Sequence, residues 1–233
     1  MILSIIIPVF NEEKTILKIL QKIENQTYIK KQIIVVDDCS TDLSLEKTKK
    51  FKFKSDYKIL SHRKNCGKGS CIKTAKKYIK GDFVIIQDAD LEYNPSDYRI
   101  ITNYFKKNKY QAIYGSRVLK KNRYSNRNFI SNFRILANHI LTIFSNIINK
   151  QGLTDAHTCY KAVNSKIFRK ITLKESGFSF CPELTTKLSN LKIPILEVPI
   201  KYKGRTVKEG KKIAFNDGIK ALITIVKYKF FDD

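Results

Sequence analysis

The chain has 233 residues, 42% of them hydrophobic and 11% aromatic, which is enough to bury one substantial core and predicts one domain with an elaborated C-terminal part. Its formal net charge of +24 points to a polyanionic neighbour such as nucleotide phosphates, nucleic acid or an anionic lipid face, although some of the lysines only decorate solvated faces. The five cysteines form no CxxC pair, and no apolar run reaches the about 20 residues that cross a bilayer, so we expect neither a disulfide framework, nor a zinc site, nor a membrane span. Because the first residues also lack a signal-peptide pattern, we expect reduced thiols and a cytoplasmic protein.

Short β-branched runs alternate with amphipathic stretches in the first half, which is typical of βαβ units and predicts an α/β fold with a mainly parallel sheet. Strands are expected at residues 3–9, 32–36, 57–60, 82–87 and 111–115. Helices are expected between them at residues 12–25, 42–50, 70–79 and 95–107. In the second half, the stretches 127–148 and 214–231 are amphipathic and basic, as in helices that lie on a membrane surface, although packing on the sheet also explains them.

Acidic residues follow several of these strands. In open α/β sheets, ligands bind beyond the carboxyl ends of the strands, and three of the five predicted ends carry acids. Asp88-Ala89-Asp90 places two carboxylates at one strand exit, where the alternation of side chains aims both to the same side. Mg²⁺ and Mn²⁺ prefer oxygen ligands and share them between carboxylates and substrate phosphates, so the pair suits a metal that bridges a diphosphate. Two acids in one surface turn are common, and alone they are weak evidence.

A basic block follows these acids. Residues 98–154 contain eleven Lys or Arg residues and no Asp or Glu. An acidic, cation-binding half beside a basic, anion-binding half is what an enzyme for a metal-bound nucleotide and a phosphate-bearing acceptor needs.

Short motifs occur in order along nearly the whole chain: Ile7-Pro8-Val9-Phe10-Asn11-Glu12, Val35-Val36-Asp37-Asp38-Cys39-Ser40-Thr41-Asp42, Gly67-Lys68-Gly69, Gln87-Asp88-Ala89-Asp90-Leu91-Glu92, Gly115-Ser116-Arg117, Thr154-Asp155-Ala156-His157-Thr158-Cys159-Tyr160-Lys161, Gly177-Phe178-Ser179-Phe180 and Gly204-Arg205-Thr206-Val207-Lys208-Glu209-Gly210-Lys211-Lys212. Each is unspecific alone. The ordered set resembles glycosyltransferase family 2, and in particular its dolichol-phosphate mannosyltransferase and bacterial polyprenyl-phosphate glycosyltransferase branch.

The resemblance implies a single GT-A type, Rossmann-like domain over residues 1–233, with a nucleotide-sugar-binding half (1–117) and an acceptor and membrane-facing half (118–233) that contains amphipathic helices. It implies inverting transfer of a hexose from a nucleoside-diphosphate sugar to a polyprenyl phosphate, dolichyl or undecaprenyl, with Mg²⁺ or Mn²⁺ as cofactor. The expected location is the cytoplasmic face of an anionic membrane surface, in the cell envelope. The sequence leaves open whether a membrane-protein partner supplies transmembrane helices.

The resemblance also assigns roles to residues. The nucleotide-sugar site would comprise Pro8, Phe10, Glu12, Val36, Asp38, Asp88, Ala89, Asp90, Arg117, Arg205 and Lys211. Asp88 and Asp90 would bind the metal with a contribution from Glu92, where relatives often have Gln or another polar residue. The catalytic residues would be Asp90, Arg117 and Asp155.

Several alternatives stay open. Asp155 and His157 are the candidate general bases, although an anionic phosphate acceptor needs none. Gly67-Lys68-Gly69 lacks the spacing of a nucleoside-triphosphate loop and is interpreted as a tight turn into a helix. A saccharide hydroxyl is the alternative acceptor. The remote alternative is a basic nucleic-acid-binding domain, but no recognised reader motif is present, and no nucleic-acid partner is expected.

Overall fold

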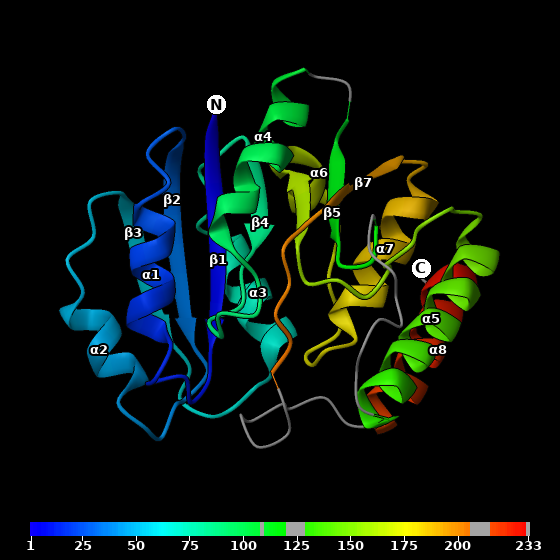
Figure 1. Cartoon of the computed structure of the whole chain (residues 1–233), viewed down its shortest axis with the longest axis horizontal. Coiled ribbons are helices and arrows are strands. Elements are labelled where there is room, and N and C mark those ends of the chain that lie inside the picture. The colour runs from blue at the N-terminus through cyan, green and yellow to red at the C-terminus, as the bar shows by residue number, and fades with distance from the viewer. Residues whose placement is uncertain (108–109, 120–128, 206–214, 232–233) are drawn as a thin grey trace.

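The computed structural model of the protein describes residues 1–107, 110–119, 129–205 and 215–231 (Figure 1). Within this part of the chain, one seven-stranded sheet has the order β3-β2-β1-β4-β6-β5-β7. Its strands are β1 (Ile2–Val9), β2 (Lys30–Asp37), β3 (Asp56–Ser61), β4 (Phe83–Ile86), β5 (Ala112–Ser116), β6 (Lys161–Asn164) and β7 (Ile195–Pro199). Of these strands, only β6 runs antiparallel to its neighbours, so the other strands end at one common edge.

The first-half strands and helices predicted from the sequence are present, and β6 and β7 complete the sheet from the C-terminal half. The helices are α1 (Ile16–Glu24), α2 (Ser44–Lys50), α3 (Lys68–Lys76), η1 (Pro95–Asp97), α4 (Tyr98–Lys106), α5 (Phe129–Asn149), α6 (Ser165–Lys170), α7 (Phe180–Asn190) and α8 (Phe215–Phe230). Helix α1 begins later than expected because Asn11 has a positive φ of 52° and the chain first turns at Glu12, whose carbonyl accepts from the N–H groups of Thr15 and Ile16.

Both faces of the sheet are buried, which explains the nearly continuous apolar runs of its strands. Alternate residues of β1, such as Ile5 and Ile6, point to opposite faces and belong to two separate core clusters. The cluster around Ile5 includes residues of α1 and α4, and the cluster around Ile6 includes residues of α3, α6 and α7. The predicted α/β fold, with helices on both faces of a mainly parallel sheet, is therefore confirmed.

Helices α5 and α8 lie side by side beyond this sandwich, at one end of the molecule, where α8 also packs on α7 (Figure 1). They correspond to the two amphipathic stretches predicted from the sequence. No described helix is both long and apolar enough to span a bilayer.

Candidate active site

The predicted site residues gather at the carboxyl edge of the sheet. Glu12 follows β1, Asp88 and Asp90 follow β4, and Arg117 follows β5. Because β6 runs in the opposite direction, the segment 154–160 that leads into it reaches the same edge and brings Asp155 there. The segment after β7 brings Arg205, while Lys211 lies outside the described residues.

Arg205 binds the acids that follow β1 and β4. Its Nη2 atom lies 2.6 Å from Asp90 Oδ2, and its Nη1 atom lies 3.1 Å from Glu12 Oε1. Glu92 holds the segment that carries this arginine, because its carboxylate accepts from the Arg205 backbone N–H at 2.5 Å and from the Tyr202 hydroxyl at 2.9 Å. The metal-ligand role expected for Glu92 stays a prediction, since this carboxylate is engaged in positioning residues 202–205.

Asp90 is buried and surrounded by other acids. Burial, together with the charges of Asp88 and Glu92, raises its pKa to about 7, although the Arg205 guanidinium acts in the opposite direction. A divalent cation beside these oxygens would favour the ionised carboxylate. The carboxylate oxygens of Asp88 and Asp90 are the hard ligands that Mg²⁺ and Mn²⁺ prefer, so the chemistry of the donor set fits such an ion.

Asp88 pairs with Lys68, the first residue of α3. The Lys68 ammonium forms a salt bridge with Asp88 Oδ1 and lies 3.2 Å from the sulfur of Cys159. Burial alone would lower the pKa of Lys68, but the Asp88 carboxylate and Cys159 raise it overall, so the side chain is a cation. Sequence reasoning identified the turn that precedes α3 but missed Lys68 as a residue of the site, because the contact joins two segments whose spacing carries no signal.

Arg117 and Asp155 form a second buried ion pair. Arg117 donates from Nε to Asp155 Oδ2 and from Nη2 to Oδ1, both at 2.7 Å, and its backbone N–H also donates to Oδ2 at 3.0 Å. Burial alone would raise the pKa of Asp155, but the Arg117 guanidinium holds it below the usual range. Both oxygens of Asp155 are thus engaged by one cation, which makes the carboxylate a weak base.

Glu197 of β7 fixes the backbone on which Asp155 lies. Its carboxylate accepts from the backbone N–H groups of Thr154 at 2.6 Å and of Asp155 at 2.8 Å. No sequence motif pointed to Glu197, because its partners become neighbours only when β5 pairs with β7.

His157 lies on the same segment and interacts with the backbone of Leu141 in α5. Burial, with the charge of Lys161, lowers its pKa to about 4, and its Nε2 atom is buried with no hydrogen-bond partner among the described residues. The imidazole is therefore neutral at pH 7.

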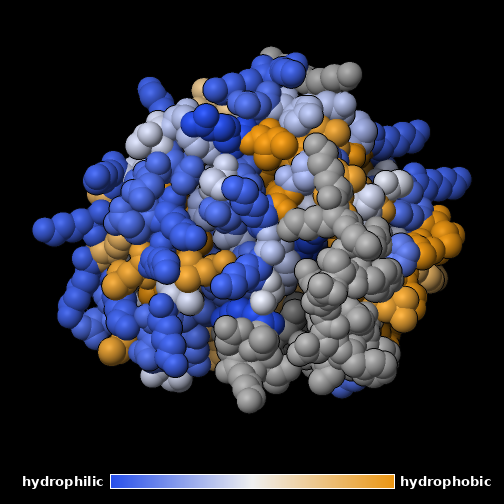
Figure 2. All heavy atoms as spheres, in the orientation of Figure 1, coloured by the Kyte–Doolittle hydropathy of each residue, from blue (hydrophilic) through white to orange (hydrophobic). Residues whose placement is uncertain are grey.

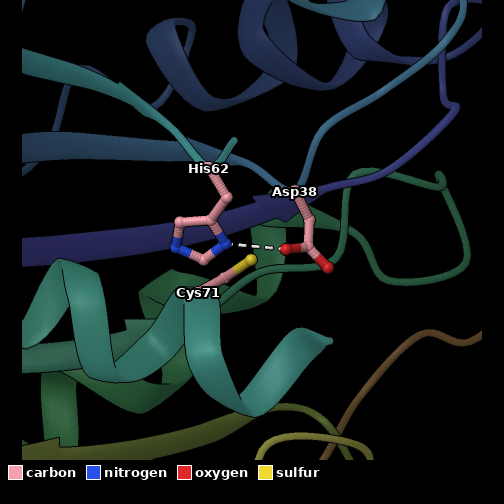
Figure 3. A group of neighbouring side chains, drawn as sticks. All are labelled: Asp38, His62 and Cys71. Atoms are coloured by element: carbon pink, nitrogen blue, oxygen red, sulfur yellow. Dashed lines mark hydrogen bonds and ion pairs between the residues drawn. The ribbon is translucent and has the colours of Figure 1, made fainter. Parts of the chain in front are cut away.

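Asp38 shapes the turn before α3 (Figure 3). Its Oδ1 atom lies 2.7 Å from His62 Nδ1 and accepts from the Cys66 backbone N–H at 2.9 Å, while Oδ2 accepts from the Gly67 N–H at 2.7 Å. Asp38, His62 and Cys71 place their ligand atoms within 4.8 Å of one another, but burial raises the pKa of the Cys71 thiol. Because the thiol stays protonated and Asp38 already accepts these bonds, the cluster organises the turn and is a poor metal site.

The remaining predicted nucleoside-binding residues line the ends of β1, β2 and β4. Pro8 and Val36 are register partners in neighbouring strands, and Phe10 follows β1. Val36 is buried, Pro8 and Phe10 are half-buried, and Ala89 is buried between the two acids. Their contact with a nucleoside stays a prediction.

The fold, with helices on both faces of one mainly parallel sheet, is that of GT-A proteins. A family model described as "Glycosyl transferase family 2" matches residues 4–172, so the chain belongs to this family and is a glycosyltransferase. The nucleic-acid-binding alternative is not favoured.

Similar proteins agree with this assignment. The chain is 27% identical to the dolichyl-phosphate beta-glucosyltransferase ALG5D of Trichomonas vaginalis, over 98% of this chain and 73% of that protein. It is 27% identical to a dolichol-phosphate mannosyltransferase of Pyrococcus furiosus, over 90% of this chain but only 60% of that protein. Glucosyl-3-phosphoglycerate synthase from Mycobacterium tuberculosis, solved in complex with Mn²⁺, uridine diphosphate and glucosyl-3-phosphoglycerate, shares the fold with a TM-score of 0.72 at 15% identity, over 99% of this chain and 81% of that one.

Proposed function

We propose that this enzyme transfers a hexose from a nucleoside-diphosphate sugar to the phosphate of a polyprenyl phosphate, dolichyl or undecaprenyl, with inversion at the anomeric carbon. The names of the similar dolichyl-phosphate glucosyltransferase and dolichol-phosphate mannosyltransferase support this acceptor class. The observation that carries the proposal is the buried pair of Arg117 and Asp155 at the carboxyl edge of the sheet.

That pair leaves the site without a suitable general base on the segment 154–160. A hydroxyl acceptor must lose a proton, which requires a base with a pKa near the working pH. Asp155 has a lowered pKa and both oxygens bound by Arg117, and the pKa of His157 is about 4. A phosphate acceptor is already an anion and needs only to be positioned, so the arrangement favours it over a saccharide hydroxyl.

The donor would bind where Asp88 and Asp90, the acids after β4, meet Lys68 and Arg205. Asp88 and Asp90 would hold Mg²⁺ or Mn²⁺, which would neutralise charge on the leaving diphosphate. Arg205 lies within hydrogen-bond distance of Asp90 and is thus placed to donate to the same diphosphate. Glu12 holds the Arg205 guanidinium from the side of β1, which keeps this donor oriented before substrate binds.

The outer helices support a membrane-surface location, because α5 buries polar side chains and exposes apolar ones. The helix buries Thr142, Ser145 and Asn149, whereas Leu136, Ile140, Ile143 and Ile147 are 44–69% exposed on its opposite face. A surface helix of a water-soluble protein normally buries its apolar stripe. Asn149 and Thr186 of α7 explain the buried polar side, since the Asn149 amide donates to the Thr186 hydroxyl at 3.2 Å.

Helix α8 extends the exposed stripe of α5. Ile219 and Ile223 are 47% and 61% exposed, and Phe230 at its end is 63% exposed. Figure 2 shows a group of hydrophobic spheres at the end of the molecule where Figure 1 places α5 and α8, as well as smaller groups elsewhere. Apolar faces with basic neighbours such as Lys220 are typical of proteins that lie on an anionic bilayer. We therefore propose that the enzyme lies on such a surface, at the cytoplasmic face, where the proposed lipid acceptor would be available.

The function is tested by supplying a panel of sugar nucleotides with polyprenyl phosphate in detergent micelles and measuring nucleoside diphosphate release. One donor should give release that depends on polyprenyl phosphate and on Mn²⁺ or Mg²⁺. Direct displacement on an α-linked donor must give a β-linked sugar phosphate, which the anomeric coupling constant of the product shows. An α-linked product would contradict the proposal, as would release that depends on a saccharide and not on the lipid phosphate.

A further inference from the structure

Lys68 occupies an enclosed position beside the carboxylate pair. Its side chain is 11% exposed and forms a salt bridge with Asp88. The rings of Phe178 and Phe180 face the ammonium, with their centroids 6.0 Å and 5.7 Å from Nζ. Aromatic faces attract a cation and exclude water, so the ammonium is held near the strand end without being fixed to a single hydrogen-bond direction.

The placement of Lys68 contradicts a local rule of helix stability. A cation in the first turn of a helix faces the positive end of the helix dipole, which is unfavourable, and Lys68 is the first residue of α3. The same end of the helix favours an anion. A lysine here is explained if it acts together with the helix end on a negatively charged group.

The packing of α3 does not need the bond between Lys68 and Asp88. Asp38 already holds the turn before the helix through the N–H groups of Cys66 and Gly67, and Ser70 donates its backbone N–H to the Ser176 carbonyl at 3.1 Å. The contact of Lys68 is therefore available for a role other than anchoring the helix.

In this structure each acid of the pair has a cation of its own: Lys68 for Asp88 and Arg205 for Asp90. A metal ion that binds both carboxylates would compete with these cations for the carboxylate charge and would repel the ammonium of Lys68. This ammonium binds Oδ1 of Asp88 and has a flexible four-carbon stem, so it can leave the carboxylate when the metal binds. A donor diphosphate bound to the same metal would offer the ammonium of Lys68 a new anionic partner.

On the basis of the donor site proposed above, we propose that Lys68 is a further catalytic residue, which neutralises Asp88 in the free enzyme and moves to the donor diphosphate when a divalent cation takes its place. Lys68 then has opposite effects on two ligands. In the absence of nucleotide, Lys68 competes with the metal for Asp88 and weakens metal binding. When a nucleoside diphosphate binds together with the metal, Lys68 strengthens their binding.

The test measures Mn²⁺ affinity by electron paramagnetic resonance, without nucleotide, and affinity for GDP and UDP by calorimetry at saturating Mn²⁺. Lys68→Met should bind Mn²⁺ alone about tenfold more tightly and the nucleotide about tenfold more weakly, which corresponds to one charge-assisted hydrogen bond. Lys68→Arg, which keeps the charge, should restore most of the nucleotide affinity. Lys77→Met removes the same charge from the exposed end of this helix and should change neither affinity.

Nucleotide binding by Lys68→Met that equals the wild type would overturn the inference, as would a loss of affinity for both ligands. Circular dichroism spectra and melting temperatures of the variants show whether such a joint loss reflects misfolding. If it does, Lys68→Arg decides: nucleotide binding by Lys68→Arg that is as weak as that of Lys68→Met also overturns the inference. Failure of the wild type to bind either nucleotide with Mn²⁺ would overturn the proposed donor site, and this inference with it. A failure of the proposed lipid acceptor alone leaves these affinities unchanged.

Discussion

At the scale of single residues, the charges of this site are neutralised inside the protein before any substrate arrives. Asp155 is paired with Arg117, Asp88 with Lys68, and Asp90 with Arg205. Pairs that are largely withdrawn from water keep donors oriented, and the Arg117 guanidinium also lowers the pKa of Asp155. We therefore expect catalysis by this enzyme to depend on the exchange of ion pairs more than on proton transfer.

Asp155→Asn should destabilise the fold because it leaves the Arg117 guanidinium buried without a counter-charge. Breaking a buried pair of this kind costs about 3 kcal/mol. Denaturant unfolding followed by circular dichroism measures the change. The matched control is Glu46→Gln, which removes one partner of the exposed pair with Lys50 and should leave the unfolding free energy nearly unchanged. Equal unfolding free energies of the two variants would show that the buried pair does not support the fold. Only in that case would a loss of activity in Asp155→Asn indicate that Asp155 acts as a general base.

His157 should make the fold sensitive to acid. Its pKa is 6.5 in the unfolded chain and about 4 in the folded protein, because burial disfavours the imidazolium. A lowered pKa means that the folded state binds fewer protons, so the contribution of His157 is complete above pH 6.5 and is lost as the pH falls toward 4. The unfolding free energy of the wild type should fall more steeply between pH 7 and pH 5 than that of His157→Asn. Parallel pH profiles would contradict the prediction.

At the scale of elements, contacts with α7 or with the segment before it set how two helices are placed. Helix α3 begins where a glycine allows the chain to pass close to residue 176, and α5 turns its polar side toward α7.

Gly67→Ala should destabilise the start of α3. Gly67 has a φ of 89°, and a Cβ atom there would lie 2.5 Å from the Ser176 carbonyl oxygen, which belongs to the backbone and has little freedom to move. Strain of this kind costs about 1–3 kcal/mol before the clash is relieved. Gly152→Ala is the control, since a Cβ atom at residue 152 meets nothing within 4 Å. Melting temperatures of the two variants measure the difference, and equal values would contradict the argument.

Charges placed on the exposed stripe of α5 should release the enzyme from membranes. The double variant Ile140→Asp, Ile147→Asp should lower affinity for anionic vesicles by at least about tenfold, because each buried isoleucine contributes about 1.5–3 kcal/mol when fully transferred. Leu17→Asp changes a side chain of α1 that is also exposed, at 43%, and should have little effect. Co-sedimentation with the vesicles measures binding. Equal losses for both proteins would indicate a general charge effect, and no loss would point to a protein partner on this face.

At the scale of the whole molecule, the net charge of +24 acts together with the apolar end formed by α5 and α8. Exposed charges attract an anionic surface over a distance that salt shortens from about 10 Å at 0.1 M to about 3 Å at 1 M. We therefore expect the charge to bring the protein to the membrane and the apolar stripe to retain it there.

Binding to anionic vesicles should therefore weaken as NaCl is raised from 0.1 M to 1 M. Binding to neutral vesicles should be weaker at low salt and should change little, because only the apolar term remains. Sedimentation of both vesicle types over this range tests the prediction. Equal binding to both at every salt concentration would show that charge has no part in the attachment.

Local patterns in the sequence determined strands β1 to β5 and one part of the site. The apolar runs that became β1, β2 and β4, and the acids that follow them, are short-range features, and parallel strands necessarily bring their carboxyl ends to one edge. The α/β fold, the family and the meeting of Glu12, Asp88 and Asp90 therefore followed from the sequence. The burial of the polar side of α5 did not, because an amphipathic pattern does not say which face is buried.

Only the tertiary structure decided how these charges are paired. Lys68 and Asp88 are 20 residues apart, Arg117 and Asp155 are 38 apart, and Asp90 and Arg205 are 115 apart. No periodicity connects residues at such separations. Their pairing depends on the strand order, in which β6 enters between β4 and β5 and brings the segment 154–160 to the site. The same insertion pairs Asp155 with Arg117, a contact that the sequence alone did not predict.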